Sequence, residues 1–193
     1  MRYDILKIFN LIESNSSILD LGCGDGELLL LLKNKKNAKV KGIDIDEKKV
    51  ISSLKKGLQV YHGDMEEVLP HYRKDSYDYV ILSLTLHQVK NPEKIIIEAA
   101  RVGKNVIISF PNFGYWKIRF NIFFKGTLPS CDYTKYEWFS DKFVHFITVN
   151  DFEKFCNKRK LKVLKKIFLP EFFAKLNPNL LSSSAIYCLR GEK

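Results

Sequence analysis

Arginine is scarce in this 193-residue chain, and its scarcity bears on the class of partner. Only six of the 32 basic residues are arginine, although the formal net charge is +10. Arginine is the preferred contact for phosphates and base edges, because its planar guanidinium donates hydrogen bonds in pairs. The lysines are scattered along the chain and form no single block. The composition therefore argues against a nucleic-acid partner and favours solvated lysines, although the charge alone leaves RNA binding open.

Closely spaced cysteines and long apolar runs are also missing. The cysteines form no Cys-x-x-Cys pair, which argues against a zinc site and for reduced thiols. They are Cys23, Cys131, Cys156 and Cys188. No apolar run approaches the roughly 18 residues needed to cross a bilayer, and Met1–Asp4 lacks the long apolar core of a signal peptide. We therefore expect a cytoplasmic protein with no membrane span and no metal.

What the chain does contain is the stretch Asp20-x-Gly22-x-Gly24-x-Gly26. Its spacing differs from the Gly-x-Gly-x-x-Gly of dinucleotide-binding proteins. The carboxylate of Asp20 would repel a pyrophosphate and attract a cationic amino group. S-Adenosylmethionine carries such a group, together with a positive sulfonium and no phosphate. The stretch predicts S-adenosylmethionine and S-adenosylhomocysteine over NAD or FAD, although a tight strand-to-helix turn also uses glycines in this way.

An acidic pair ends the second expected strand, residues 40–46. A parallel open sheet binds ligands at the carboxyl ends of its strands. There Asp44 can accept hydrogen bonds from both hydroxyls of a ribose. Asp46 can instead cap the helix expected over 47–56, and both roles are compatible.

The third expected strand, residues 58–64, also ends in an acid. Asp64 can accept from the amino group of adenine while Met65 packs on the ring. Alternatively, Asp64 caps a helix over 66–69.

Cys23 lies inside the glycine stretch, where the simplest interpretation is a small residue that fills space. A redox or nucleophilic role would need a nearby base that the sequence does not show. The expected cofactor-binding residues are Asp20, Gly22, Cys23, Gly24, Gly26, Asp44, Ile45, Asp64, Met65 and Leu82.

Helices and strands alternate up to residue 110, which predicts an α/β fold with a parallel sheet covered by helices on both faces. The expected strands are 18–21, 40–46, 58–64, 77–84 and 105–110, and the expected helices are 4–13, 27–36, 47–56, 66–69 and 92–100. A helix over 148–159 and a closing antiparallel pair of strands, 162–168 and 185–189, follow. Residues 170–184 form a long connection without a clear period.

Residues 111–147 break this rhythm. The stretch from 110 to 146 holds 13 of the 25 aromatic residues of the chain. We expect one domain over 1–193 that carries an aromatic-rich insertion at about 111–147, after the fifth strand.

Four features together resemble the class I methyltransferases that use S-adenosylmethionine. They are the Asp20–Gly26 stretch, Asp44, Gly63-Asp64 and Tyr77–Ile81. This resemblance covers roughly residues 1–110. It implies a Rossmann-like, mostly parallel seven-stranded sheet in the order 3-2-1-4-5-7-6, with the last strand antiparallel.

A narrower resemblance, to the methionine-biosynthesis protein MetW family, spans most of the chain. The segments that carry it are Leu19–Leu29, Asp78–Ser83, Ile108–Trp116 and His145–Thr148 with Asp151–Glu153. Members of that family are associated with homoserine O-acyltransferase, and the motifs imply no methyl acceptor. His87 departs from the family pattern, where glutamine is expected, so its role stays open.

Catalytic candidates are few, because the leaving group in methyl transfer is a neutral thioether and a base is needed only if the acceptor must lose a proton. They are His87, Tyr115 and Tyr136. His87 is also compatible with a histidine bonded to backbone, and the tyrosines with a lid, an acceptor pocket or a docking face. Three hypotheses follow: a cofactor-binding partner of the acyltransferase, a methyltransferase of a small molecule, and an RNA methyltransferase.

Overall fold

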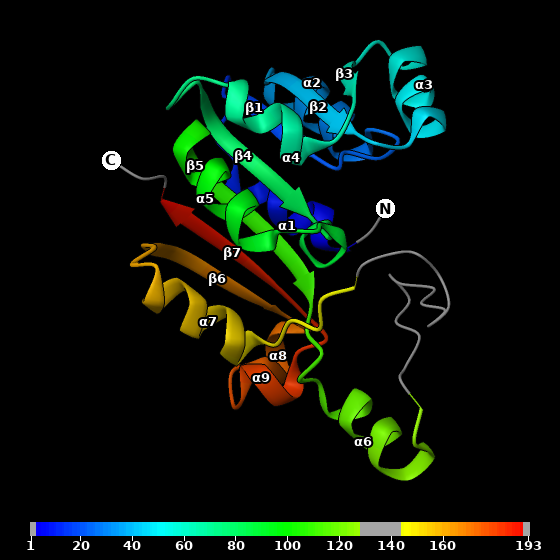
Figure 1. Ribbon diagram of the computed structural model, residues 1–193, viewed down its shortest axis with the longest axis vertical. Coiled ribbons are helices and arrows are strands. Elements are labelled where there is room, and N and C mark those ends of the chain that lie inside the picture. The colour runs from blue at the N-terminus through cyan, green and yellow to red at the C-terminus, as the bar shows by residue number, and fades with distance from the viewer. Residues whose placement is uncertain (1–2, 128–143, 191–193) are drawn as a thin grey trace.

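The computed structural model of the chain describes residues 3–127 and 144–190, which are organised around one seven-stranded sheet (Figure 1). The strand order is β3-β2-β1-β4-β5-β7-β6. β7 runs antiparallel to both of its neighbours, and the other four pairings are parallel. The strands are β1 (Ser17–Leu21), β2 (Lys39–Asp44), β3 (Gln59–His62), β4 (Tyr77–Ser83), β5 (Gly103–Pro111), β6 (Val163–Leu169) and β7 (Ser184–Arg190). The expected sheet order is confirmed.

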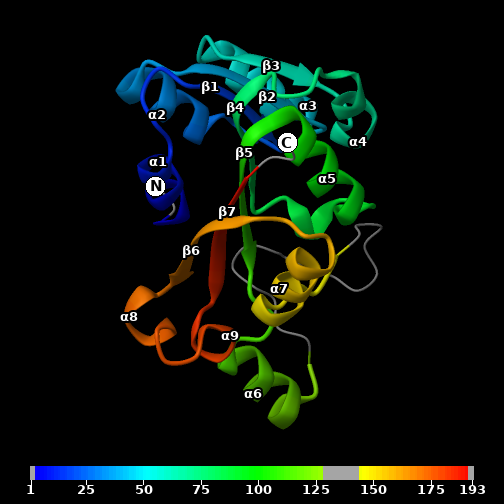
Figure 2. The ribbon, with the colours of Figure 1, turned by 90° about the vertical axis from the view of Figure 1, so that its left-hand side faces the viewer.

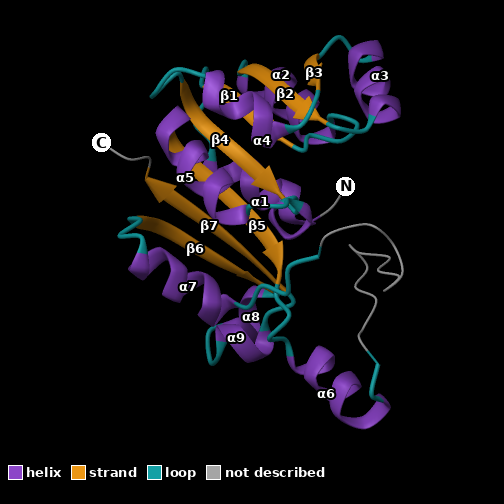
Figure 3. Ribbon diagram, viewed as in Figure 1, coloured by secondary structure: helices purple, strands orange, loops and turns teal. Residues whose placement is uncertain are grey.

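Helices cover both faces of the sheet (Figures 2 and 3). They are α1 (Tyr3–Leu11), α2 (Glu27–Lys36), α3 (Glu47–Lys55), α4 (Met65–Val68), α5 (Pro92–Val102), α6 (Trp116–Lys125), α7 (Val149–Lys158), α8 (Glu171–Ala174) and α9 (Pro178–Leu181), with 3-10 turns η1 (Leu69–His71) and η2 (Leu86–Gln88). None of the helices within 3–127 and 144–190 is long and apolar enough to span a membrane.

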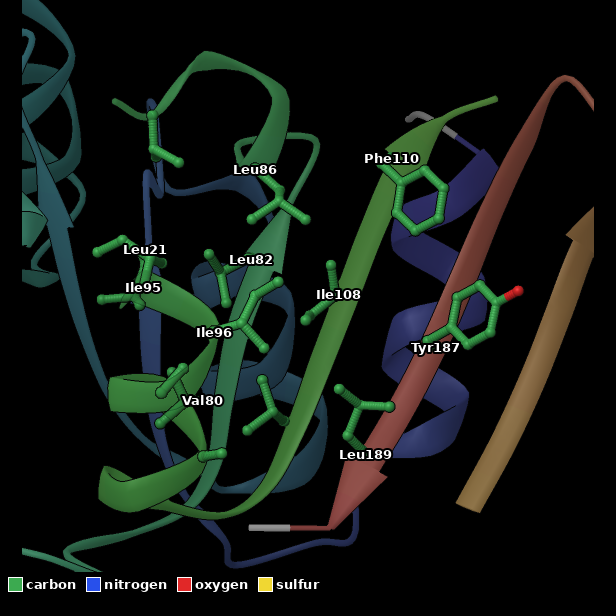
Figure 4. Close-up of a cluster of buried hydrophobic side chains, with 14 of the residues drawn as sticks. Leu21, Val80, Leu82, Leu86, Ile95, Ile96, Ile108, Phe110, Tyr187 and Leu189 are labelled. Carbon is green, nitrogen blue, oxygen red and sulfur yellow. The ribbon is translucent and has the colours of Figure 1, made fainter. Parts of the chain in front are cut away.

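The alternation of side chains along β4 explains its apolar run from Tyr79 to Leu82. Val80 and Leu82 belong to the core shared with α5 (Figure 4) and with α7, whereas Tyr79 and Ile81 belong to the core shared with α1 and α2. A strand covered on both faces needs apolar residues at successive positions. Both clusters therefore hold the strand ends at fixed positions.

Three aromatic rings join β5, β7 and α7. The ring centroids of Phe110 and Phe152 lie 4.8 Å apart, and those of Phe152 and Tyr187 lie 4.7 Å apart. The Tyr187 hydroxyl donates to Glu153 at 3.0 Å. This packing fixes the antiparallel half of the sheet against α7.

Asn112 joins three segments at the end of β5. Its side-chain amide donates to the carbonyls of Asn179 at 2.9 Å and Ser182 at 2.8 Å. Its side-chain oxygen accepts from the backbone N–H of Gly114 at 2.9 Å and of Val149 at 3.2 Å. The segment Ile108–Trp116, which carries the family resemblance, is therefore a structural junction.

The structure adds elements that the sequence pattern did not indicate. Residues 170–184 include the short helices α8 and α9, and the region expected as an insertion, 111–147, includes α6. The strand expected over 105–110 begins two residues earlier, at Gly103, which is also the C-cap of α5. Tyr136 lies outside the described residues, and the single-domain organisation over 1–193 remains a prediction.

Phe152→Ala should lower the free energy of unfolding by about 3–5 kcal/mol, because Phe152 is only 3% exposed and its removal leaves a cavity between the rings. Urea unfolding measures the change. Phe123→Ala is the matched control, since Phe123 on α6 is 81% exposed, and it should cost under about 0.5 kcal/mol. Equal losses in the two variants would contradict the assigned packing.

Candidate functional site

A cleft of about 1010 Å³ opens at the carboxyl ends of β1, β2, β3 and β4. Most of its wall comes from the last residues of these strands and from the segments that follow them. Eight of the residues expected from the sequence line it: Asp20, Gly22, Cys23, Gly24, Asp44, Ile45, Asp64 and Met65. Other wall residues include Glu66, Ser83, Leu84, Thr85 and Gln88. These eight residues span 45 positions of the sequence, from Asp20 to Met65, and the structure brings them to one cleft.

The buried carboxylate of Asp44 holds the glycine stretch against the end of β2. It accepts from the backbone N–H of Gly24 at 2.6 Å and of Asp46 at 2.9 Å, one on each oxygen. A carboxylate has about four lone-pair sites. Asp44 therefore keeps acceptor capacity toward the cleft while it organises the loop.

The structure explains glycine at positions 22 and 24 in two different ways. Gly22 has φ +76°, and a Cβ there would lie 2.5 Å from Thr85 Cγ2, so Thr85 closes tightly over the loop. Gly24 has φ +57°, and a Cβ there would meet nothing within 4 Å. Backbone that turns this way beside open space gives a ligand close access to the main chain.

Asp46 and Asp64 both act as helix caps. Asp46 accepts from the N–H groups of Lys48 and Lys49 at the start of α3. Asp64 accepts from the N–H of Glu66 at 2.8 Å at the start of α4. The cap expected at Asp46 is confirmed. Asp64 uses one oxygen in its cap, so a role toward adenine remains a prediction for the other.

The cleft has a strongly acidic wall. Seven carboxylates line it, against the two lysines Lys49 and Lys90. The acidic residues are Asp20, Asp25, Glu27, Asp44, Asp46, Asp64 and Glu66. Like charges in a partly enclosed site reinforce one another. The wall therefore disfavours phosphate-bearing ligands and favours cationic ones.

Several expected site residues lie off this wall. Gly26 is the N-cap residue of α2, and Leu82 is fully buried in the core. Tyr115 is the N-cap residue of α6, and His87 is fully buried. Neither of these two catalytic candidates lines the cleft, and the third, Tyr136, is outside the described residues.

His87 lies in η2, just behind the rim of the cleft. Its Nε2 lies 3.0 Å from Gln88 Nε2, and its carbonyl accepts from the backbone N–H of His145 at 2.9 Å. Burial, and secondarily the proximity of His145, lowers the pKa of His87 to about 4. The ring is therefore neutral at pH 7 and is a weak base.

Cys23 packs in a confined space, as its simplest interpretation predicts. Its Sγ would lie 2.5 Å from a Cβ at Gly42, so the thiol fills the gap between the loop and β2. Burial, and then the charges of Asp20 and Asp44, raises the pKa of the thiol. Nucleophilic and redox chemistry need the thiolate, which this environment disfavours.

Sequence reasoning missed the corner between β4 and η2. Leu84 has φ +55°, a left-handed conformation that costs a leucine roughly 1–2 kcal/mol. Its backbone N–H donates to both the carbonyl and the hydroxyl of Ser109, at 3.1 and 3.0 Å. No local pattern signals a left-handed leucine, because the conformation is imposed by the neighbouring strand.

Glu66 was also missed. Its carboxylate accepts from the N–H groups of Lys90 at 2.7 Å and Asn91 at 3.0 Å, and from Asn91 Nδ2 at 2.7 Å. These hydrogen bonds of Glu66 connect α4 to the loop before α5 at the rim of the cleft. Only an acid in the first turn of a helix is visible in the sequence, and that is too common to indicate such a contact.

The sheet order and the position of the cleft define the class I S-adenosylmethionine-dependent methyltransferase fold. An S-adenosylmethionine-dependent methyltransferase from Mesorhizobium loti matches with a TM-score of 0.71, at 18% identity over 96% of each chain. One from Archaeoglobus fulgidus matches with a TM-score of 0.70, at 15% identity over 97% of this chain and 91% of that chain. Similarity at this identity concerns the fold alone.

The particular family follows from the sequence match. Residues 2–189 match the family model for methionine biosynthesis protein MetW, so the chain belongs to the MetW family. A curated relative, the bifunctional methionine biosynthesis protein MetXA/MetW of Rhodopirellula baltica, is 28% identical over 177 residues. That alignment covers 87% of this chain but only 28% of the relative.

His87→Gln should make the protein less sensitive to acid. A histidine with a lowered folded-state pKa contributes stability that is present above its unfolded value of about 6.5. That stability is lost as the pH falls toward the folded value of about 4. Wild type should therefore lose about 3 kcal/mol more than the variant between pH 7 and pH 4 in urea unfolding. His71→Gln, at an exposed histidine, is the control, and parallel pH curves for wild type and His87→Gln would contradict the shift.

Proposed function

We propose that this MetW-family protein binds S-adenosylmethionine and S-adenosylhomocysteine in the acidic cleft. The observation that carries the proposal is the carboxylate set around a glycine loop with open main chain at Gly24. A ligand with an ammonium group and two vicinal hydroxyls, and without phosphate, matches this donor and acceptor chemistry. The residues present therefore fit the cofactor that methyltransferases of this fold use.

Each part of the cofactor has a candidate contact on the wall. Asp20 would attract the ammonium group, Asp44 would accept from the ribose hydroxyls, and Asp64 would accept from the adenine amino group. Ile45 and Met65 would flank the adenine ring. Ile45 is 69% exposed although it is apolar, and covering it would remove that surface from water.

The cofactor, when bound, supplies a methyl group on a positive sulfonium with a neutral leaving group. The contribution of this chain is to orient that group and to exclude water, an effect worth on the order of 7–11 kcal/mol at best. His87 is buried and weakly basic, and Tyr115 is off the wall. The cleft therefore offers no histidine or tyrosine base among its described wall residues.

We further propose that the protein acts in methionine biosynthesis together with homoserine O-acyltransferase. Family membership supports the pathway, and the fused MetXA/MetW relative supports a partnership, because fused activities often belong to one process. Because the described wall has no histidine or tyrosine, an acceptor that must lose a proton would have to use a carboxylate as its base.

The alternative function is transfer of a methyl group to a small molecule. The size and polarity of the cleft favour it, because a volume of about 1010 Å³ leaves room for an acceptor. Release of S-adenosylhomocysteine from S-adenosylmethionine in the presence of cell metabolites would establish it. Asp20→Ala serves as the inactive control.

S-Adenosylhomocysteine at about 100-fold its Kd should raise Tm by about 5–10 °C, because the ligand stabilises only the folded state. Asp44→Ala should weaken binding about 10- to 100-fold by removing charged acceptors. A thermal unfolding scan measures the Tm shift, and calorimetric titration measures the affinity.

Asp46→Asn is the matched control for this experiment, since asparagine keeps the cap of α3 while it removes one charge from the cleft. It should bind within about threefold of wild type. Stabilisation by NAD, or equal losses in the two variants, would contradict the assigned cleft chemistry.

Homoserine O-acyltransferase should co-elute with this protein in size-exclusion chromatography and should change its rate of acyl transfer when the chain is added. Addition of S-adenosylmethionine should alter that change if the cleft acts as a sensor. A titration with the Asp44→Ala variant separates partner binding from cofactor binding. Absence of both a complex and a rate change would contradict the partnership and leave the cofactor proposal standing.

A further inference from the structure

A second hollow lies at the opposite end of the sheet from the acidic cleft. It has a volume of about 780 Å³ and is bounded by the amino ends of β1, β2 and β4 together with the turns before them. Five basic or imidazole side chains line it: Lys33, Lys39, Lys41, His71 and Arg73. We refer to it as the basic groove. Its wall shares no residue with the wall of the acidic cleft.

No carboxylate balances this charge within the groove. None of the described residues that line it is an aspartate or a glutamate. The nearest acid along β4, Asp78, accepts from the N–H and hydroxyl of Ser17 at 2.9 and 2.7 Å and from Lys104 at 2.8 Å. Asp78 is therefore paired with Lys104, and the described lining of the groove carries a net positive charge.

The lining side chains are available as donors. Lys33 gives one hydrogen bond to the carbonyl of Gly57 at 2.8 Å, and an ammonium has three donors. Lys39, Lys41, His71 and Arg73 are exposed. Ser17 and Lys39 are register partners, and Lys41 follows two positions along β2. Lys39 and Lys41 therefore lie on the same side of β2, and the other basic residues of the groove come from α2, from η1 and from the turn before β4.

The aromatic side chains of the groove do not form a stacking platform. Tyr72 and Tyr77 pack on each other with ring centroids 5.8 Å apart, and Tyr77 is buried. Binding of single-stranded nucleic acid usually adds stacking of bases on open aromatic faces. The groove thus offers contacts for phosphates and little for a run of bases.

We propose that the basic groove binds a small anion that carries two or more phosphate groups. Lysines bind phosphate as point charges, and one arginine adds a paired donor. A volume of about 780 Å³ lies in the range of small-molecule sites. The site is independent of the proposed function, because other residues form it and it lies at the amino ends of the strands, not at their carboxyl ends.

Calorimetric titration of the full chain with sodium tripolyphosphate tests the proposal. Wild type should bind, and the affinity should fall several-fold between about 50 mM and 200 mM salt, because the contacts are ionic. Lys39→Gln combined with Arg73→Gln should weaken binding at least about tenfold. Both residues are exposed, so an unchanged Tm is expected and is checked in the same samples.

Lys158→Gln combined with Lys165→Gln is the matched control. It removes the same charge from α7 and β6, outside both hollows, and should bind within about twofold of wild type. No binding by wild type, or equal losses in the two double variants, would overturn the proposal.

Pyrophosphate and adenosine diphosphate, titrated side by side, distinguish bare phosphates from phosphates on a nucleoside, and binding of either supports the proposal. If oligouridylate of about 20 nucleotides binds about 100-fold more tightly than tripolyphosphate, and the groove variant loses that binding, RNA is the occupant and the proposal fails.

Discussion

The carboxylate of Asp44 is the contact on which the candidate site depends. It joins the loop after β1, through Gly24, to the turn after β2, through Asp46. Asp46 then caps α3, and Ser53 on α3 donates back to the carbonyl of Gly24 at 3.1 Å. These contacts form a closed circuit of local and long-range hydrogen bonds. The loop therefore keeps its shape through hydrogen bonds within the protein.

Much of this circuit is readable from the sequence, because each part has a local signal. The bounds of α2, Glu27–Lys36, and the cap at Asp46 agree with prediction, since glycines, caps and apolar runs act within a few residues. The left-handed conformation of Leu84 and the hydrogen bonds of Glu66 could not be predicted, because the residues that hold them lie on other elements. α6 escaped for a different reason: its four aromatic residues lie on one side of the helix and its two isoleucines on the opposite side, so no single apolar face marks it.

The segment that carries the family resemblance serves the scaffold. Ser109 holds the corner after β4, Phe110 packs in the core, and Asn112 joins the start of α7 to the end of α9. Gly114 is confined by the same junction, since a Cβ would lie 2.6 Å from the side chain of Asn179. Ile108–Trp116, one of the segments that carry the family resemblance, thus braces the carboxyl end of the sheet. The acidic cleft opens at the same carboxyl end of the sheet.

The left-handed Leu84 has a consequence for how the cleft can respond. Its conformation is held by two hydrogen bonds to Ser109, against an intrinsic preference for ordinary backbone. If Leu84 returned to ordinary backbone angles, the relief of this strain would offset part of the free energy needed to rearrange the corner. The glycine loop that Asp44 holds stores no comparable backbone strain, because glycine adopts positive φ freely. Moving this loop would break its hydrogen bonds to Asp44 with no strain relieved in return. A rearrangement of the cleft is therefore expected to cost less on the β4 side than at the glycine loop.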